Sequence, residues 1–226
     1  MPATIEVSGP DAGAARVTLA RPDKRNALSV ALRDEVSNAL AALAADPAVK
    51  VVVVTGAGSV FSAGFDLDEF KQAAADPAFH RRLWESSDRF HRACLGFPLP
   101  LVAAVNGPAI AGGFDLAVMC DIRVAAATAT FSHPELLFGD VVYSPLHELV
   151  GGAVARELAL TGRVVDAREQ PGLEVERRAG GDARAPHDLR LRAQEHLARR
   201  AREPGTLRAI LRQLGISLDD FYGRKN

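Results

Sequence analysis

Apolar residues dominate two short segments, residues 50–55 (KVVVVT) and 101–105 (LVAAV). The first has four consecutive valines and the second is apolar throughout, which predicts strands that are buried on both faces. Neither run approaches the length of a membrane span. Residues 4–7 (TIEV) and 15–19 (ARVTL) mix apolar and polar positions and predict two more short strands, joined by a turn at residues 9–13.

Amphipathic segments with helical spacing lie between these runs. Ser29 is the expected N-cap of a helix that continues to about Ala45, because apolar residues recur there every three to four positions. The same reasoning predicts a short helix after Asp66, further helices over residues 78–95, 114–120 and 144–160, and short strands over residues 121–125 and 129–131.

The pattern weakens after Asp166. Residues 170–186 contain three glycines and two prolines and are interpreted as a loop, whereas residues 187–202 and 204–214 predict two arginine-rich helices. We therefore expect an α/β fold, with a core domain over residues 1–168 and an arginine-rich helical C-terminal region over residues 169–226.

Composition narrows the class of protein. The 226 residues are 48% hydrophobic, and 28 acidic against 27 basic side chains give a net charge of -1. This balance disfavours disorder and binding to nucleic acid. Two cysteines are too few for a disulfide scaffold or a four-thiolate zinc site. Because no signal peptide or membrane span is recognisable, a soluble cytoplasmic protein without membrane contact is expected.

Two glycine-containing loops are the most informative local features. Gly64 and Gly112 each follow a buried strand and each precede a helix. The first N–H groups of a helix have no partner within it, so two such groups aimed at one point would bind a developing oxyanion. The alternative is that these glycines only permit close packing.

Other catalytic motifs are absent from the sequence. It contains no phosphate-binding P-loop, no dinucleotide-binding glycine pattern and no G-x-S-x-G nucleophile turn. The six histidines have no ligand-like spacing, so no metal is expected. His133 and His147 lie near the second glycine loop, and His147 is interpreted as a packed or surface residue of a helix.

Five ordered segments resemble the crotonase superfamily, which comprises enoyl-CoA hydratases and isomerases. Two of them contain the glycine loops, one precedes the first helix, and two follow the second loop. They are residues 21–28 (RPDKRNAL), 60–69 (VFSAGFDLDE), 105–123 (VNGPAIAGGFDLAVMCDIR), 134–135 (PE) and 160–163 (LTGR). The resemblance covers residues 4–168 approximately and is specific for the superfamily rather than for one reaction.

The resemblance implies a spiral of ββα turns that assembles as a homotrimer or homohexamer. It implies an acyl-CoA substrate whose thioester oxygen lies between the backbone N–H groups of Phe65 and Gly112. CoA is then part of the substrate, and no separate cofactor is expected. By the same resemblance, Lys24 and Arg25 lie near the CoA phosphates, and the adenine lies near three further residues, Ala27, Ala63 and Leu67.

The two glutamates of the family's hydratases correspond here to Asp115 and Glu135. Aspartate at the first position is similar to the family's dienoyl-CoA isomerases. The family's usual glycine-rich segment after the second glutamate is bulkier here, so Asp140 and Tyr143 are candidate polar participants near the substrate. Each carboxylate also has a structural alternative, as a helix cap for Asp115 and as an arginine partner for Glu135.

Three hypotheses about function follow from these observations. The first is an enoyl-CoA hydratase or isomerase of fatty acid metabolism, with Asp115 and Glu135 as the acid/base pair. The second is a non-catalytic acyl-CoA-binding or assembly subunit with the same fold. The third is hydrolase chemistry on a diketone or ester without CoA. A hydratase needs both carboxylates at one water molecule, an isomerase needs one base, and a binding subunit needs neither.

Overall fold

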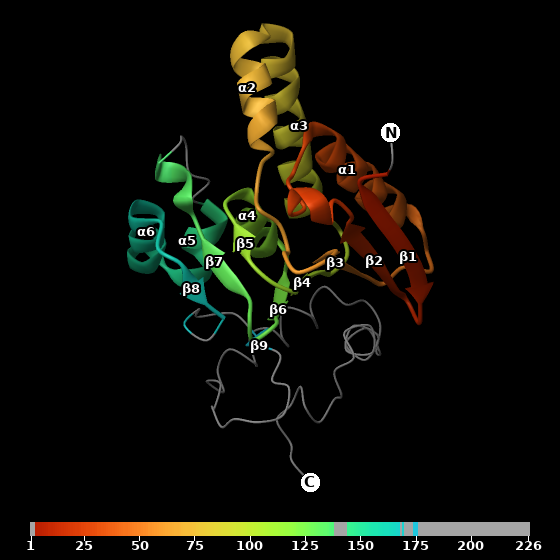
Figure 1. The fold of residues 1–226 in the computed structure, drawn as a ribbon. Coiled ribbons are helices and arrows are strands. Elements are labelled where there is room, and N and C mark those ends of the chain that lie inside the picture. The colour runs from red at the N-terminus through yellow and green to blue at the C-terminus, as the bar shows by residue number, and fades with distance from the viewer. Residues whose placement is uncertain (1–2, 138–143, 168, 170–173, 176–226) are drawn as a thin grey trace.

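Two β-sheets organise the chain (Figure 1). The computed structural model describes residues 3–137, 144–167, 169 and 174–175. The larger sheet has parallel neighbours throughout, except that its first two strands are antiparallel. Its order is β1 (Ile5–Asp11), β2 (Ala14–Leu19), β3 (Val51–Gly56), β4 (Leu101–Val105), β6 (Ile122–Ala125) and β9 (Glu174–Val175). The smaller sheet orders β5 (Ala109–Ile110), β7 (Thr130–Ser132) and β8 (Val165–Asp166).

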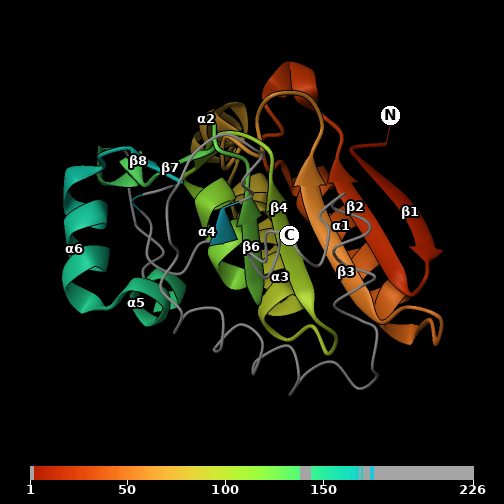
Figure 2. The ribbon, with the colours of Figure 1, turned by 90° about the horizontal axis from the view of Figure 1, so that it is seen from below.

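Helices alternate with these strands, as the hydrophobic pattern predicts. α1 packs on α3 and on β1 and β2, α4 contacts β4 and β5, and α5 packs on α6. Figure 2 shows α5 and α6 at the side of the molecule that is farthest from β1. The helices are η1 (Pro22–Lys24), α1 (Val30–Ala45), α2 (Leu67–Ala75), α3 (Pro77–Leu95), α4 (Gly112–Met119), η2 (Pro134–Leu137), α5 (Ser144–Val150) and α6 (Gly152–Thr161).

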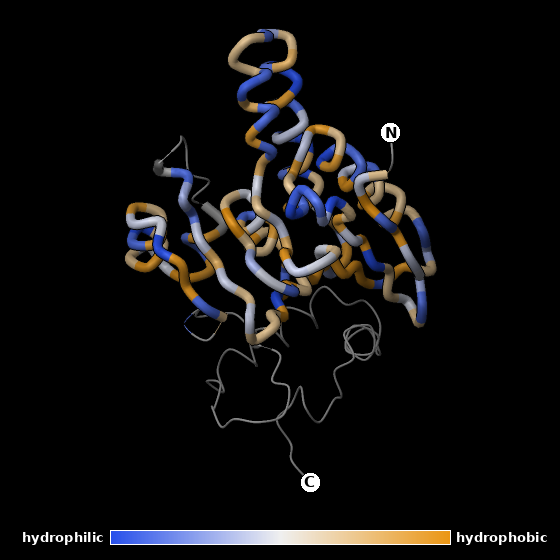
Figure 3. The backbone as a smooth tube through the Cα atoms, viewed as in Figure 1, coloured by the Kyte–Doolittle hydropathy of each residue, from blue (hydrophilic) through white to orange (hydrophobic). Residues whose placement is uncertain are grey.

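The valines of β3 confirm the prediction of a strand buried on both faces. Val52 and Val54 belong to the main core with the helices, whereas Val51 and Val53 belong to a second buried cluster on the other side of the sheet. All four are fully buried. Strand alternation sends neighbouring side chains to opposite faces, so a continuous apolar run is needed here. The central strands are accordingly hydrophobic in Figure 3.

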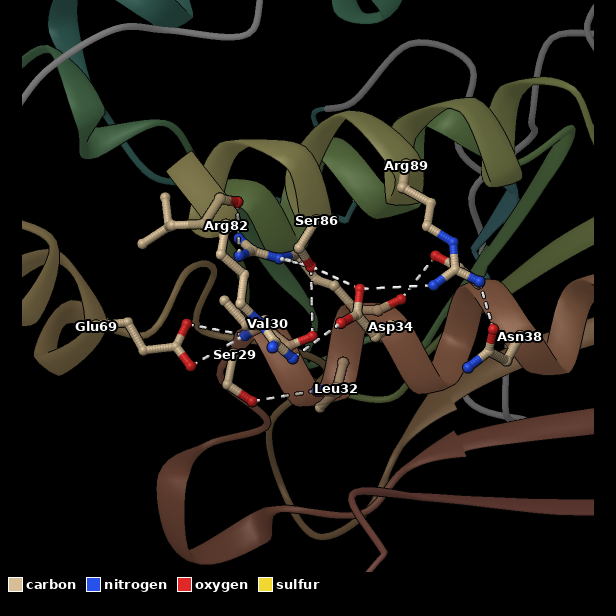
Figure 4. A network of polar contacts seen from close by, with 12 residues as sticks. Ser29, Val30, Leu32, Asp34, Asn38, Glu69, Arg82, Ser86 and Arg89 are labelled. Atoms are coloured by element: carbon tan, nitrogen blue, oxygen red, sulfur yellow. Dashed lines mark hydrogen bonds and ion pairs between the residues drawn. The ribbon is translucent and has the colours of Figure 1, made fainter. Parts of the chain in front are cut away.

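The start of α1 is fixed by two side chains. The Oγ of Ser29 accepts a hydrogen bond from the N–H of Leu32 (3.2 Å), which confirms the predicted N-cap. The carboxylate of Glu69, from α2, accepts one from the N–H of Val30 (2.8 Å). Figure 4 shows both contacts, together with Ser86 of α3 facing α1. Helices α1, α2 and α3 are thereby tied together at one end of α1.

Three local predictions need correction. The predicted helix over residues 144–160 is two helices, because Gly151 lies between them with φ of 78° and interrupts the helical backbone. The first strand continues to Asp11, so the turn is shorter than expected. Residues 174–175 form β9 beside β6 rather than a loop, which extends the sheet past residue 168. The predicted helices over 187–202 and 204–214 lie outside the described residues.

No helix in the described part of the chain is both long enough and apolar enough to cross a membrane.

Candidate active site

The first glycine loop lies against the segment that precedes α1. The N–H of Leu28 donates to the carbonyl of Gly64 (2.8 Å), and the N–H of Ala63 donates to the carbonyl of Arg25 (3.0 Å). These contacts place the segment expected to bind CoA beside the first loop. Gly64 has φ of 83°, a left-handed conformation that L side chains rarely adopt.

The second glycine loop meets the first directly. A Cβ added at Gly64 would lie 3.0 Å from the backbone nitrogen of Gly112 and 2.8 Å from the carbonyl oxygen of Ile110. Among the described residues, no acceptor takes a hydrogen bond from the N–H of Phe65 or of Gly112. Two unpaired backbone donors therefore stand at adjoining loops, as an oxyanion site requires.

The backbone of the second loop is strained just before its donor. Ala111 has φ of 55° and ψ of -129°, a region that non-glycine residues avoid. Its N–H donates to the carbonyl of Ser132 in β7 (2.9 Å), which holds it in place. The strain sets the direction of the next peptide group, which carries the N–H of Gly112.

The ring of Phe65 rests under a buried arginine. The guanidinium carbon of Arg33 lies 4.4 Å above the ring centroid. Arg33 is fully buried, donates to the carbonyl of Leu83 (3.1 Å), and contacts Ser86 Oγ at 3.4 Å. Burial lowers the pKa of its guanidinium to about 10, which still leaves it charged at neutral pH. This cation–π contact fixes the residue whose N–H is the first candidate donor.

Three titratable side chains converge one helical turn from Gly112. Asp115 lies in the first turn of α4, and His133 and Glu135 come from the end of β7 and from η2. His133 Nε2 is 3.7 Å from Asp115 Oδ1, and His133 Nδ1 is 3.3 Å from Glu135 Oε1. The imidazole therefore lies between the two carboxylates that the sequence resemblance selected. We refer to the three residues as the carboxylate–histidine cluster.

The cluster is buried and incompletely hydrogen-bonded. Asp115 is 2% exposed and His133 is not exposed at all, while the Glu135 side chain is 19% exposed. Asp115 Oδ1, His133 Nε2 and Glu135 Oε2 are buried atoms without a hydrogen-bond partner. Burial raises the pKa of the Asp115 carboxyl well above its ordinary value, and the charge of Glu135 raises it further. Such a set suits proton transfer to a bound molecule.

The three side chains of the carboxylate–histidine cluster are also of the kinds that bind metal ions. One donor atom from each of the three lies within 4.8 Å of the others, a spacing that a divalent cation can bridge. However, the two carboxylates face different nitrogens of the ring. The two carboxylates therefore do not share one nitrogen as they would around a single ion, and we assign no metal to the cluster.

The residues expected to bind CoA lie around the first loop. Lys24 and Leu67 are exposed, and the Lys24 ammonium is 3.7 Å from the Asp68 carboxylate. Ala27 is nearly buried, and Ala63 and Arg25 are joined by the backbone hydrogen bond given above. Asp140 and Tyr143 lie outside the described residues.

Sequence reasoning missed two members of this site. His133 precedes Pro134-Glu135 by sequence, and that proximity to a candidate carboxylate was the available signal. Arg33 interrupts the apolar face of α1, since it occupies a buried position between Leu32 and Val36. A charged residue within the apolar face of a helix indicates a buried polar contact, although it does not identify the group that the residue contacts.

Several proteins of known sequence are similar to this chain over much of its length. A profile of the family described as "Enoyl-CoA hydratase/isomerase" matches residues 9–185. A Thermus thermophilus protein named as a candidate enoyl-CoA hydratase is 38% identical over 216 residues, covering 91% of this chain and 83% of that protein. The mitochondrial enoyl-CoA hydratase of Pongo abelii is 36% identical over 163 residues, covering 70% of this chain and 55% of that protein. The chain covers 60% of the length of a related protein from Mycobacterium leprae.

Solved structures share the fold. An enoyl-CoA hydratase/isomerase from Xanthobacter autotrophicus aligns with a TM-score of 0.72 at 32% identity, covering 94% of this chain and 80% of that one. An enoyl-CoA hydratase from Bacillus anthracis gives 0.72 at 26% identity, covering 97% and 87%. The fold is that of the crotonase superfamily, as the sequence resemblance predicted. With the profile match, the chain belongs to the enoyl-CoA hydratase/isomerase family.

Proposed function

We propose that this chain is an enzyme that acts on acyl-CoA thioesters through an enolate and hydrates a 2-enoyl-CoA. The observation that supports this most strongly is the combination of two unpaired N–H donors with the carboxyl groups of the buried Asp115 and the partly buried Glu135. The names of the relatives favour hydration over double-bond isomerisation, which uses the same intermediate. Both reactions place negative charge on the thioester oxygen.

The donors would stabilise that charge. The N–H groups of Phe65 and Gly112 have no acceptor among the described residues, so they lose no internal hydrogen bond when an oxyanion binds. A donor of this kind contributes about 10²–10³ in rate. The positive end of the α4 dipole lies at Gly112 and acts in the same direction.

The carboxyl groups would move the protons. Asp115 follows Gly112 by three residues in the same helix, about one turn, so its carboxyl group and the second donor lie on the same side of α4. Adding water across a double bond needs one group that accepts a proton from water and one that delivers a proton to carbon. Asp115 and Glu135 supply such a pair.

The CoA moiety would lie along the segment before α1. Lys24 and Arg25 provide positive charge for the phosphates, and Ala27, Ala63 and Leu67 provide small or apolar contacts for the adenine. Residues 24–28 and 62–65 are joined by backbone hydrogen bonds, so this surface and the first donor form one unit. We also keep the prediction that copies of the chain form a closed homotrimer or homohexamer.

The test measures 2-enoyl-CoA loss and 3-enoyl-CoA formation separately. Glu135→Gln should lower kcat for hydration by about 10²–10⁴ and leave KM similar, because general acid–base catalysis contributes that much. Asp115→Asn should cost a comparable factor if both groups act on one water molecule. If it costs little while isomerisation persists, the reaction is a one-base isomerisation.

Two exposed residues of α3 serve as matched controls. Glu85→Gln and Asp88→Asn make the same chemical changes outside the cluster and should leave kcat unchanged. If the unmodified protein binds CoA esters but converts neither substrate, the non-catalytic binding subunit replaces the enzyme hypothesis.

A further inference from the structure

His133 is a buried titratable residue to which the proposed reaction gives no role. Its ring lies between the two carboxyl groups, with Nδ1 toward Glu135 Oε1 (3.3 Å) and Nε2 toward Asp115 Oδ1 (3.7 Å). One face of the ring stacks on Phe114, with the ring centroids 4.7 Å apart. Among the described residues, these two carboxyl groups are the acidic groups within 4 Å of a nitrogen of the ring.

The two contacts differ in length and in kind. The shorter contact, to Glu135 at 3.3 Å, lies within hydrogen-bond distance, and Nδ1 is the donor in it when the ring carries its hydrogen on Nδ1 and Glu135 is ionised. In the neutral ring Nε2 is then an acceptor, and its lone pair faces Asp115 Oδ1. At 3.7 Å the two atoms form no hydrogen bond, and both lack a partner. A lone pair facing an ionised carboxylate oxygen is repulsive, whereas protonation of Asp115 removes the repulsion and supplies a hydrogen that Nε2 can accept once the two atoms approach.

Burial independently favours this protonation state. Asp115 is 2% exposed, and the pKa of its carboxyl group is raised well above the ordinary value by burial and by Glu135. Glu135 is the more exposed of the two carboxyl groups. A neutral acid and an ionised base can thus coexist in the cluster, where two ionised carboxylates would repel each other.

We propose that His133 is a positioning residue that assigns the two roles: its Nδ1–H holds Glu135 as the proton acceptor, and its Nε2 receives the hydrogen of Asp115, the proton donor. This assignment rests on the proposed function. It makes the cluster an ordered chain, from the hydroxyl of Asp115 through the imidazole to the carboxylate of Glu135. The order of the chain decides which carboxyl group is charged in the free enzyme.

The assigned charge state begins dehydration, the reverse of the proposed hydration. Hydration runs the same steps backwards and begins after a proton has moved from Asp115 to Glu135. Glu135 takes the proton from Cα, and the electrons of that C–H bond form the thioester enolate. The enolate collapses to the Cα–Cβ double bond as the C–O bond at Cβ breaks, and the leaving hydroxyl takes the proton of Asp115 and departs as water. After product release Glu135 loses its proton and Asp115 regains one.

A first experiment uses stability and needs no substrate. Because the pKa of folded Asp115 is raised above its unfolded value, this residue favours the folded state most at acidic pH, and that contribution is lost as pH rises from about 4 through the folded pKa. Asp115→Asn keeps an N–H that can donate to Nε2 and has no such loss. Its stability relative to the unmodified protein should therefore rise with pH. Asp88→Asn, on the exposed face of α3, should show no such trend.

A second experiment observes the ring itself. ¹⁵N spectra of histidine-labelled protein, with His133 assigned by its loss in His133→Gln, should show a protonated Nδ1 and an unprotonated Nε2 near pH 7. A hydrogen on Nε2, hydrogens on both nitrogens, or an Asp115→Asn variant that is less stable than the unmodified protein at neutral pH would overturn the proposal.

A third experiment separates positioning from packing. His133→Phe keeps a ring against Phe114 but removes both nitrogens, and it should lower kcat 10–100-fold with little change in KM. His133→Gln keeps one donor and one acceptor and should restore kcat to within several-fold. Equal activity in the two variants would overturn the proposal. If no CoA ester reacts at all, the proposed function fails, while the spectra and the stability profiles still decide the role of His133.

Discussion

The two glycine loops present similar donors but rest on very different supports. The second loop opens α4, in which all eight residues are buried, so its donor is part of the core. The first loop leads into α2, in which Ala73 is the buried residue, and α2 projects away from the sheets with the start of α3 (Figure 1). One donor is therefore positioned by packing, and the other by specific polar contacts.

Those polar contacts surround the first loop on several sides. Arg33 lies over the Phe65 ring, and Arg21 forms an ion pair with Asp66 at 3.0 Å. Glu69 reaches back to α1. Because polar contacts depend on single side chains, substitutions near the first loop should reduce activity more than stability. Substitutions at the second loop should reduce stability first. The following predictions test this difference.

The largest effect is expected for Gly64→Ala. The new Cβ would lie 2.7 Å from Ala111 Cβ, and alanine would have to adopt φ of 83°. The two loops would be forced apart, so kcat/KM should fall about 10²–10³-fold, the loss expected for one oxyanion donor. Gly151→Ala is the matched control, because it has the same backbone strain at φ of 78° but open space around the new Cβ. Equal losses in the two variants would contradict the prediction.

Gly113→Ala should mainly affect stability. Its Cβ would lie 2.4 Å from the carbonyl oxygen of Ser62, within the packed contact of the two loops. Overpacking of this kind costs about 1–3 kcal/mol of unfolding free energy, which denaturant titration measures. Gly112→Ala, whose nearest contact would be 3.5 Å, should stay close to the stability of the unmodified protein. Comparable destabilisation of both variants would show that the second loop is not rigidly packed.

Arg33→Met should lower kcat about tenfold and change the unfolding free energy by ~1 kcal/mol or less. The variant removes the cation over Phe65 but keeps apolar volume. It loses a desolvated cation–π contact worth about 2 kcal/mol but also relieves the desolvation of the buried guanidinium, so stability changes by less than that. Steady-state kinetics and denaturant titration measure the two quantities. Arg82→Met, an exposed arginine of α3, should change neither. If stability falls while kcat is retained, Arg33 supports the helices rather than the donor.

The smallest effect is expected for Asp68→Asn. The carboxylate lies 3.7 Å from the Lys24 ammonium and would compete for it with the CoA phosphates, if these bind where we propose. Removing it should raise CoA affinity about twofold at low salt, and Lys24→Ala should lower it by a similar factor, because exposed ion pairs are weak and screened. Calorimetry at low and high salt measures both. A change in affinity that persists at high salt would place the CoA phosphates elsewhere.

The sequence by itself determined the elements and the class of the protein. The valine run of β3, the N-cap Ser29 and the glycine of the first loop encode their structures locally, through strand alternation, side-chain capping and backbone freedom. The order of the motifs identified the family. It also selected Asp115 and Glu135, which the structure brings to different nitrogens of one imidazole.

Only the tertiary structure decided how these groups meet. Nothing in the spacing of Arg33 and Phe65, or of Asp115 and His133, specifies a contact, because each pair is joined by packing between separate elements. The break at Gly151 likewise depends on how α5 and α6 pack against their neighbours, since isolated glycines are tolerated within helices. Local patterns fix the conformation of a segment, whereas the pKa of Asp115 and the position of the Phe65 ring depend on what other segments bury beside them.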